Sequence, residues 1–289
     1  ALQVNLQTVY YLRTSCLLLV DRYNDKGKVR QLFRETMRKN SANYPSLHNK
    51  SVFITGGASG IGSSLVEHFS AQGAKVNFID IDDKNAIELI SVIDGNVSYK
   101  HCNVFDINAL QNAISEFEES MGGSIDILVN NAGRDDRHSA LKINTDDWDA
   151  CLNVNLRHQF FAAQAVHAGM AAVGGGSIIN LGSTVVSMAA GNMAAYVTAK
   201  AGIQGMTRAL ARDFGKNQIR VNCIQPGWIL TERQQELWFD ENSEKTIVQN
   251  QCLPTTLHPE DVASMALFLA ADDSRHCTAQ SFVVDGGWT

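Results

Sequence analysis

The chain contains the stretch Thr55-Gly56-Gly57-Ala58-Ser59-Gly60-Ile61-Gly62, which directly follows the apolar residues 52–54. Ile61, Leu65 and Phe69 then recur every four residues, so they would share one face of a helix. Glycines between a strand and a helix allow a tight turn and let the backbone approach a pyrophosphate, which the N–H groups of the helix N-terminus stabilise. The stretch therefore predicts a dinucleotide-binding turn in a parallel α/β sheet.

An acidic residue, Asp80, ends the next apolar run, eighteen residues after Gly62. A carboxylate at that position hydrogen-bonds the ribose hydroxyls of NAD and repels the additional 2′-phosphate of NADP. No Lys or Arg lies in the glycine stretch or immediately after Asp80, so no adjacent cation would neutralise that phosphate. A solvated acid at a strand end is the alternative interpretation. The pattern favours NAD as the cofactor.

Short apolar runs alternate with helix-length segments from Ser51 onward, which is typical of a parallel sheet wound on both faces. Right-handed crossovers would place helices on both sides of this sheet. We expect a Rossmann-type, doubly wound α/β fold with a seven-stranded parallel sheet, forming one NAD-binding catalytic domain over residues 44–289. The predicted strands are residues 52–55, 76–79, 97–102, 125–129, 177–181, 220–224 and 282–284.

The formal net charge of the 289 residues is −6, which argues against nucleic acid as a main partner. Residues 1–50 carry nine Lys/Arg and three Asp/Glu, whereas the remaining residues carry fifteen and twenty-seven. We interpret residues 1–43 as a basic accessory extension, with a transit peptide or a surface-binding arm as the alternatives. A short helix is expected there from the spacing of Val29, Leu32, Phe33 and Met37.

No apolar run reaches the ~18 residues that a membrane span requires, so no membrane association is expected. The six cysteines are scattered without a C-x-x-C pair, which favours reduced, packed thiols in a cytoplasmic compartment over disulfides or a zinc site. We therefore expect no metal. The cysteines are Cys16, Cys102, Cys151, Cys223, Cys252 and Cys277.

Tyr196 and Lys200 lie four residues apart, so a helix would bring both side chains onto one face. A phenol with an ordinary pKa of about 10 is a poor base at neutral pH, but a positive charge within about 4–6 Å favours its ionised form. Taken without other motifs, the pair could equally be a Tyr and a Lys exposed on the surface of a helix. Ser183, thirteen residues upstream at the end of an apolar run, and the glycine stretch favour general-base chemistry instead.

Several motifs together resemble the short-chain dehydrogenase/reductase family in order and spacing, from the glycine stretch through residues 130–133 to Pro226-Gly227. The resemblance covers about residues 44–289 and implies an NAD-dependent oxidoreductase, commonly a homotetramer. It implies the catalytic residues Asn155, Ser183, Tyr196 and Lys200, with Asn155 in a helix over residues 146–170 and holding a water that links Lys200 to solvent. The cofactor-binding residues implied are Gly56, Ser59, Gly60, Ile61, Gly62, Asp80, Ile81, Asn103, Val104, Asn131, Ala132, Gly133, Tyr196, Lys200, Pro226, Gly227, Ile229 and Thr231.

Residues 131–138, 153–158 and 231–234 more closely resemble bacterial sugar 1-dehydrogenases, above all those of the D-xylose type. This resemblance implies oxidation of the anomeric C1 hydroxyl of an aldose to the aldonolactone. The polar residues 134–138 suit a sugar, because its hydroxyls need donors and acceptors; a loop salt-bridge network or a subunit contact is the alternative. Residues 228–251 are expected to form a lid over the substrate. The substrate-binding residues expected are Arg134, Asp135, Arg137, Ser183 and Trp228.

Two other functions remain open at this point. A short-chain dehydrogenase/reductase acting on another secondary alcohol or carbonyl, such as a 3-ketoacyl group, would be expected to have an apolar pocket, whereas residues 134–138 are strongly polar. A catalytically silent NAD-binding regulator would be expected to have lost Tyr196 or Lys200, and both are present.

Overall fold

A seven-stranded parallel sheet forms the centre of the molecule, in a computed structural model that describes residues 42–93, 95–238 and 241–289. The strand order is β3-β2-β1-β4-β5-β6-β7, and it reverses direction between β1 and β4. This arrangement confirms the predicted Rossmann-type fold class, whereas the helix expected from Val29 to Met37 lies outside the described residues. The strands are β1 Ser51–Thr55, β2 Lys75–Asp80, β3 Val97–His101, β4 Ile127–Asn130, β5 Gly176–Leu181, β6 Ile219–Pro226 and β7 Ser281–Val284.

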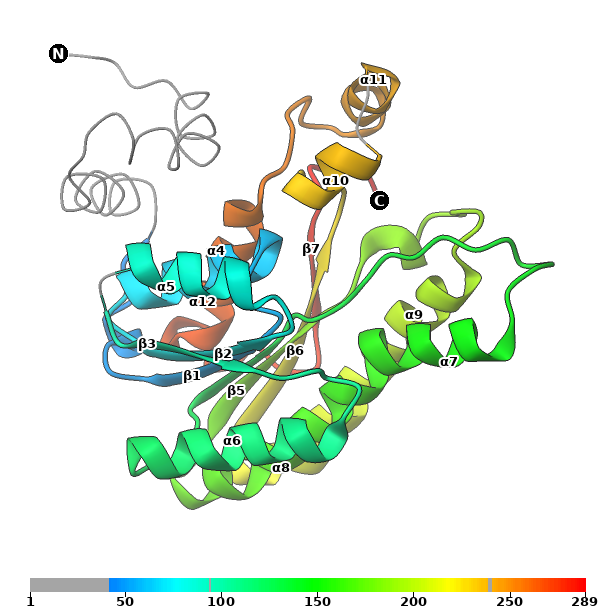
Figure 1. Cartoon of the computed structure of the whole chain (residues 1–289). Coiled ribbons are helices and arrows are strands. Elements are labelled where there is room, and N and C mark those ends of the chain that lie inside the picture. The colour runs from blue at the N-terminus through cyan, green and yellow to red at the C-terminus, as the bar shows by residue number, and fades with distance from the viewer. Residues whose placement is uncertain (1–41, 94, 239–240) are drawn as a thin grey trace, which may run out of the picture.

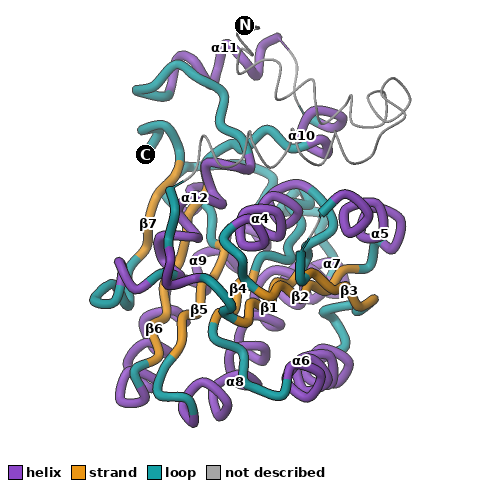
Figure 2. Tube along the Cα trace, turned by 90° about the vertical axis from the view of Figure 1, so that its left-hand side faces the viewer, coloured by secondary structure: helices purple, strands orange, loops and turns teal. Residues whose placement is uncertain are grey.

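Helices cover the sheet on both faces (Figure 1). One apolar core lies between the sheet and α4, α5 and α12, and a second lies between the sheet and α6, α8 and α9. Figure 2 shows the strands running between these two groups of helices. The helices are α4 Gly60–Ala71, α5 Asp83–Val92, α6 Ile107–Met121, α7 Thr145–Leu152, α8 His158–Ala172, α9 Ala194–Phe214, α10 Glu232–Leu237, α11 Glu241–Asn250 and α12 Pro259–Ala270.

All seven predicted strands are confirmed, with ends that differ by at most two residues. The reason for the central strands is burial on both faces, because a strand covered by helices on either side is apolar at nearly every position. The edge strands β3 and β7 are more exposed. Val52, Phe53 and Ile54 of β1 are completely buried, although their side chains alternate between the two cores.

The expected continuous helix over residues 146–170 is wrong in its middle. The segment contains α7, a π-helical turn at Asn153–Arg157, and then α8. Side-chain hydrogen bonds of Asn155 to backbone outside the turn accompany this irregularity, and π turns of this kind occur frequently at functional sites.

The predicted lid, residues 228–251, contains the helices α10 and α11. The expectation of packed thiols is wrong for Cys252, which is exposed, while Cys102, Cys151 and Cys223 are buried and Cys277 is half-buried.

The glycine turn between β1 and α4 leaves no room for a side chain at Gly62. A Cβ on Gly62 would lie 1.8 Å from the carbonyl oxygen of Gly56. Gly56 itself has φ +70°, and its own Cβ would lie 2.8 Å from the Cα of Ala132 after β4. Glycine at both positions is therefore required by close backbone approach and, at Gly56, by the left-handed conformation.

We predict that Gly62→Ala destabilises the fold by about 1–3 kcal/mol and weakens dinucleotide binding, because the turn must open to accommodate the methyl group. The matched control is Gly205→Ala in the exposed part of α9, where a Cβ meets nothing within 4 Å. That control should gain up to about 1 kcal/mol, because Ala is the better helix former. Denaturant unfolding with and without NAD measures both effects. Equal stability and NAD affinity of Gly62→Ala and the control would contradict the prediction.

Candidate active site

The phosphate-binding part of the site is the N-terminus of α4. The N-cap residue Ser59 makes no side-chain cap hydrogen bond, so its hydroxyl does not occupy the first-turn N–H groups of the helix. Asp80 at the end of β2 lies beside this turn, and its Oδ2 accepts a 2.9 Å hydrogen bond from the N–H of Ala58. Its Oδ1 accepts from the N–H groups of Ile81 and Asp82 at 2.7 and 3.1 Å. These bonds fix the carboxylate at the position predicted for recognition of a ribose.

The segment after β4 supports the same turn. The N–H groups of Asn131 and Ala132 both donate to Oγ1 of Thr55 at 3.1 Å, and Nδ2 of Asn131 donates to the carbonyl of Gly56 at 2.7 Å. Asn131 and Ala132 therefore hold the carboxyl end of β1 and the glycine turn in place. The sequence predicted only that they lie beside the cofactor, so this structural role is additional.

The other predicted cofactor residues lie at strand ends along the same edge of the sheet. Thr231 approaches the turn, with its Cγ2 3.1 Å from where a Cβ on Gly60 would stand. Pro226 ends β6 and Ile229 is buried just beyond it, while the N–H of Gly227 donates to Val284. Near β3, Val104 is buried, whereas Oδ1 of Asn103 accepts a hydrogen bond from its own loop at Phe105.

These features fit a dinucleotide. Gly56, Gly57, Gly60 and Gly62 carry no Cβ in this turn, and Gly60 has φ +55° at the start of the helix, so the backbone N–H groups there are open to a pyrophosphate. Ile81, beside the Asp80 carboxylate, is a large apolar side chain that remains 64 % exposed, which suits contact with an adenine ring. The predicted set therefore converges on one edge of the sheet, at the point where the strand order reverses.

Lys200 of α9 lies at the centre of the predicted catalytic group. Its side chain is almost completely buried, and Nζ donates a 2.8 Å hydrogen bond to the carbonyl of Leu181 at the end of β5. Nζ lies 5.6 Å from the ring centroid of Tyr196 on the same helix. Burial lowers the pKa of Lys200 to about 8, because a low-dielectric environment disfavours the charged ammonium.

The side chain of Tyr196 forms a hydrogen bond with that of Ser183, which follows β5. This bond favours the ionised phenol, but burial and the nearby carboxylate of Asp135 act in the opposite direction, and together they raise the pKa of Tyr196. The structure thus differs from the expectation that Lys200 lowers the pKa of Tyr196. The reason is that the half-buried phenol has lost hydration and the ammonium is hydrogen-bonded to the Leu181 carbonyl.

Asn155 is completely buried in the π-helical turn and connects it to the segment after β4. Its Oδ1 accepts from the N–H of Arg134 at 2.9 Å, and its Nδ2 donates to the carbonyls of Arg134 and Cys151 at 3.0 Å each. A Cβ on Gly133 would lie 2.9 Å from Oδ1 of Asn155 and 3.4 Å from Nζ of Lys200. Asn155 and Lys200 therefore both approach the backbone at Gly133, and the role of Asn155 in holding a water remains a prediction.

The predicted substrate residues after β4 contact the predicted lid. Nε2 of Gln234 in α10 donates to Oδ2 of Asp135 at 2.9 Å. The guanidinium carbon of Arg137 lies 3.8 Å from the ring centroid of Trp238, a cation–π contact. The indole N–H of Trp228 is buried and has no hydrogen-bond partner among the described residues. Residues 134–138 and 228–238 therefore form one polar surface beside Tyr196.

Sequence reasoning did not find Gln234 or Trp238 as partners of this surface, nor Cys151, whose carbonyl and thiol both contact Asn155. Cys151 could have been found, because it lies four residues before Asn155 in a helical pattern. The pairing of Gln234 with Asp135 joins residues that are 99 positions apart, so no local signal predicts it.

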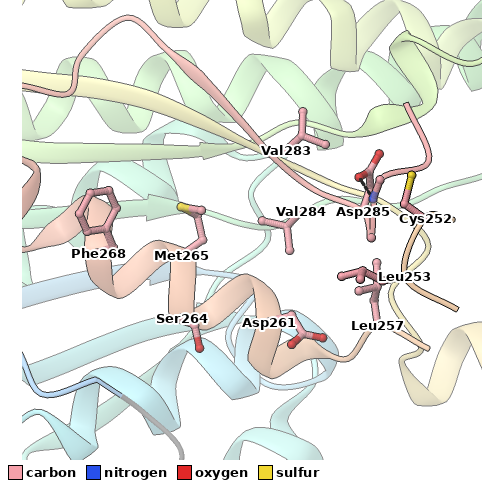
Figure 3. Close-up of a pocket in the computed structure, with 12 residues that line it drawn as sticks. Cys252, Leu253, Leu257, Asp261, Ser264, Met265, Phe268, Val283, Val284 and Asp285 are labelled. Carbon is pink, nitrogen blue, oxygen red and sulfur yellow. Dashed lines mark hydrogen bonds between the residues drawn. The ribbon is translucent and has the colours of Figure 1, made fainter. Parts of the chain in front are cut away.

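A separate pocket of about 700 Å³ lies between α12, β7 and the residues before α12 (Figure 3). Its lining is mostly apolar and includes Met265, Phe268 and Val283. No predicted catalytic residue lines it, so it is not the proposed site of chemistry. Among the residues that the structure describes, no group of three or more His, Cys, Asp or Glu could hold a metal ion, and no helix is long and apolar enough to cross a membrane.

The fold and the site together define a nicotinamide-dependent oxidoreductase. The sheet is doubly wound and parallel with a glycine turn after β1, and Ser183, Tyr196 and Lys200 meet at the end of β5. The protein belongs to the short-chain dehydrogenase/reductase family. Residues 56–289 match a model of this family that is described as enoyl-(acyl carrier protein) reductase. The chain is thus an enzyme, and the alternative of a catalytically silent regulator is not supported.

Comparisons with individual proteins agree on the family. The chain is 45 % identical to D-xylose 1-dehydrogenase of Caulobacter vibrioides, over 86 % of this chain and 99 % of that one. It is 41 % identical to a protein of Rhizobium meliloti designated a galactose dehydrogenase, over 86 % and 98 %, and 34 % identical to a 3-oxoacyl-[acyl-carrier-protein] reductase of Chlamydia pneumoniae, over 84 % and 98 %. A solved structure from Agrobacterium tumefaciens, designated a gluconate dehydrogenase, superposes with a TM-score of 0.81 at 26 % identity, covering 86 % of this chain and 98 % of that one.

We predict that Tyr196→Phe lowers kcat by about 10²-fold or more while NAD affinity survives, because only the hydroxyl can transfer a proton and the ring still packs. Tyr44→Phe is the matched control, since Tyr44 packs against the core on the opposite side of the domain from α9. Steady-state kinetics and NAD titration of both variants provide the measurement. Turnover of Tyr196→Phe above about a tenth of wild type would exclude Tyr196 as the proton-transfer residue.

Proposed function

We propose that the protein oxidises the anomeric C1 hydroxyl of an aldose, a D-xylose-like pentose or related sugar, to the aldonolactone with NAD as the oxidant. The observation that carries this proposal is that Ser183, Tyr196 and Lys200 meet at the end of β5, with the polar residues 134–138 held to the same site by Asn155. Similarity to proteins named as D-xylose and galactose dehydrogenases supports the sugar. Arg134, Asp135, Arg137 and Trp228 would contact its hydroxyl groups.

In this mechanism Tyr196 acts in its ionised form: the phenolate accepts the proton of the substrate hydroxyl and becomes a neutral phenol, and Ser183 positions the substrate oxygen. Bound NAD supplies the hydride acceptor. Lys200 places a positive charge near the phenol, and at neutral pH its pKa of about 8 leaves it mainly protonated. Asn155 holds the backbone at Arg134, so the segment that carries the substrate residues stays fixed beside Tyr196.

The preference for NAD over NADP rests on Asp80. Its carboxylate is held by three backbone N–H groups beside the phosphate-binding turn, where a 2′-phosphate would meet a fixed negative charge. Asp82 and Asp83 follow it, so the local charge is negative. Together these acids would disfavour NADP.

We expect Asp80→Asn to reduce the ratio of kcat/KM for NAD to that for NADP by about tenfold or more, because the amide removes the charge and keeps one hydrogen-bond acceptor. Asp106→Asn is the control, because Asp106 caps α6 and Asn caps a helix equally well. Kinetics with both cofactors give the ratio. Equal efficiency of the wild type with NAD and NADP would refute this role for Asp80.

A cytoplasmic homotetramer is part of the proposal. β7 is an edge strand with Val283 45 % exposed, and it adjoins the apolar pocket of Figure 3. An exposed strand edge beside apolar surface suits pairing with a second copy of the chain.

Reduction of a 3-ketoacyl thioester is the less favoured alternative. Relatives with that activity in their names are 34 to 35 % identical to this chain, against 45 % for the D-xylose dehydrogenase. Charged groups on residues 134–136 also suit a polyol better than an acyl chain.

The substrate proposal predicts that aldoses support NADH formation far better than simple secondary alcohols. Each buried polar group left unpaired by a hydroxyl-free substrate costs roughly 1–3 kcal/mol, so several such groups give a discrimination of about 10² or more. The measurement is NADH absorbance over a panel of pentoses, hexoses, 6-deoxy sugars and secondary alcohols, with slow acid release as the sign of a lactone product. NADH formation from an apolar alcohol or a β-hydroxyacyl thioester, and from no aldose, would contradict the sugar assignment.

A further inference from the structure

We propose that Asp135 binds the hydroxyl on the carbon next to the one that is oxidised, so that the enzyme selects aldoses with a free 2-hydroxyl over their 2-deoxy forms. This inference rests on the proposed sugar oxidation. It assigns to one carboxylate of the polar surface a particular position on the substrate.

The first argument is the place of Asp135 in the site. It follows Gly133 by two residues, and Gly133 is the point where Asn155 and Lys200 come together. The charge of Asp135 acts on both Tyr196 and Lys200. Among the carboxylates in the described part of the chain, Asp135 alone has an effect on both members of this pair. Asp135 is therefore an acidic group of the catalytic site, on the segment whose backbone Asn155 holds beside Lys200.

The second argument is the hydrogen-bonding capacity of the Asp135 carboxylate. Its Oδ2 accepts one bond, from Nε2 of Gln234 at 2.9 Å. Its Oδ1 lies 3.6 Å from Nε of Arg233, which is an ion-pair distance and too long for a hydrogen bond. An ionised carboxylate can accept about four hydrogen bonds, and this side chain is only 18 % exposed. A substrate hydroxyl is a suitable donor for the remaining capacity.

The third argument is electrostatic. A carboxylate beside Tyr196 raises the pKa of the phenol and so opposes the ionisation that a general base needs. Asp135 therefore does not assist proton removal directly. A substrate hydroxyl that donates to the Asp135 carboxylate forms a charge-assisted hydrogen bond, which is stronger than a bond between neutral groups. This gain in substrate binding offsets the unfavourable effect of the carboxylate on ionisation of Tyr196.

Hydrogen-bond donors on the lid complement this acceptor. The indole N–H groups of Trp228 and Trp238 are buried, and neither has a partner among the residues that the structure describes. Trp238 is also fixed by the guanidinium of Arg137. Buried donors on the lid, together with the half-buried Asp135 acceptor that contacts the lid, suit a ligand with several hydroxyls, each of which both donates and accepts.

The neighbouring acid provides a matched control. Asp136 pairs with the guanidinium groups of Arg134 and Arg233. Asp136→Asn thus removes one negative charge from the same segment and leaves the group that we assign to the substrate intact.

The experiment compares kcat/KM for D-xylose with 2-deoxy-D-xylose, and for D-galactose with 2-deoxy-D-galactose, in the wild type, Asp135→Asn and Asp136→Asn. We expect the wild type to prefer the 2-hydroxy sugar by about 10- to 100-fold. Asp135→Asn should reduce that preference to within about threefold, mainly through loss of efficiency on the 2-hydroxy sugar. Asp136→Asn should keep the wild-type ratio. Thermal unfolding and NAD titration establish that each variant is folded.

The outcomes separate this inference from the proposed function. If aldoses are oxidised but the wild type treats the two members of each pair equally, the role of Asp135 is wrong and sugar oxidation stands. The same conclusion follows if Asp135→Asn slows both members equally, because the carboxylate then acts only by holding the lid. If no aldose is oxidised, both proposals fail.

Discussion

The hydrogen bond from the buried ammonium of Lys200 to the carbonyl of Leu181 is the constraint on which the site depends. Removing an ammonium from water is costly unless polar groups replace its hydration, and the lowered pKa of Lys200 records that cost. The bond joins α9 to the carboxyl end of β5 and thereby fixes Tyr196, one helical turn earlier, beside Ser183. The placement of the catalytic hydroxyls therefore follows from where this one charge is held.

Close packing around Lys200 also constrains the segment that follows β4. Gly133 has no side chain, so Asn155 and Lys200 can both lie against its backbone. The side-chain amide of Asn155 forms hydrogen bonds with the backbone of Arg134. The π-helical turn lies at Asn155, where these bonds are made. Because Arg134 begins the polar surface, the geometry of the substrate side depends on the same group of contacts. Catalysis and recognition are thus coupled through residues 133–135.

Much of this architecture could be predicted from sequence because it is encoded locally. The central strands β1, β4, β5 and β6 are buried on both faces and largely apolar, and Tyr196 and Lys200 are four apart on a regular helix. The π-helical turn at Asn153–Arg157 could not be predicted, since local periodicity favours a continuous helix and only tertiary hydrogen bonds of Asn155 interrupt it. The contact of Gln234 with Asp135 and the direction of the Lys200 ammonium also arise from segments that meet only in the folded chain.

The most direct measurement of the buried lysine is the pH dependence of the free energy of unfolding, compared between the wild type and Lys200→Met. The folded-state pKa of Lys200 is about 8, and an unfolded lysine has a pKa of about 10.4. Between these values the unfolded chain binds more protons, so stability of the wild type relative to Lys200→Met should rise as pH increases from 8 to 10. A stability difference that stays constant over this range, or falls, would contradict a buried lysine held at the end of β5.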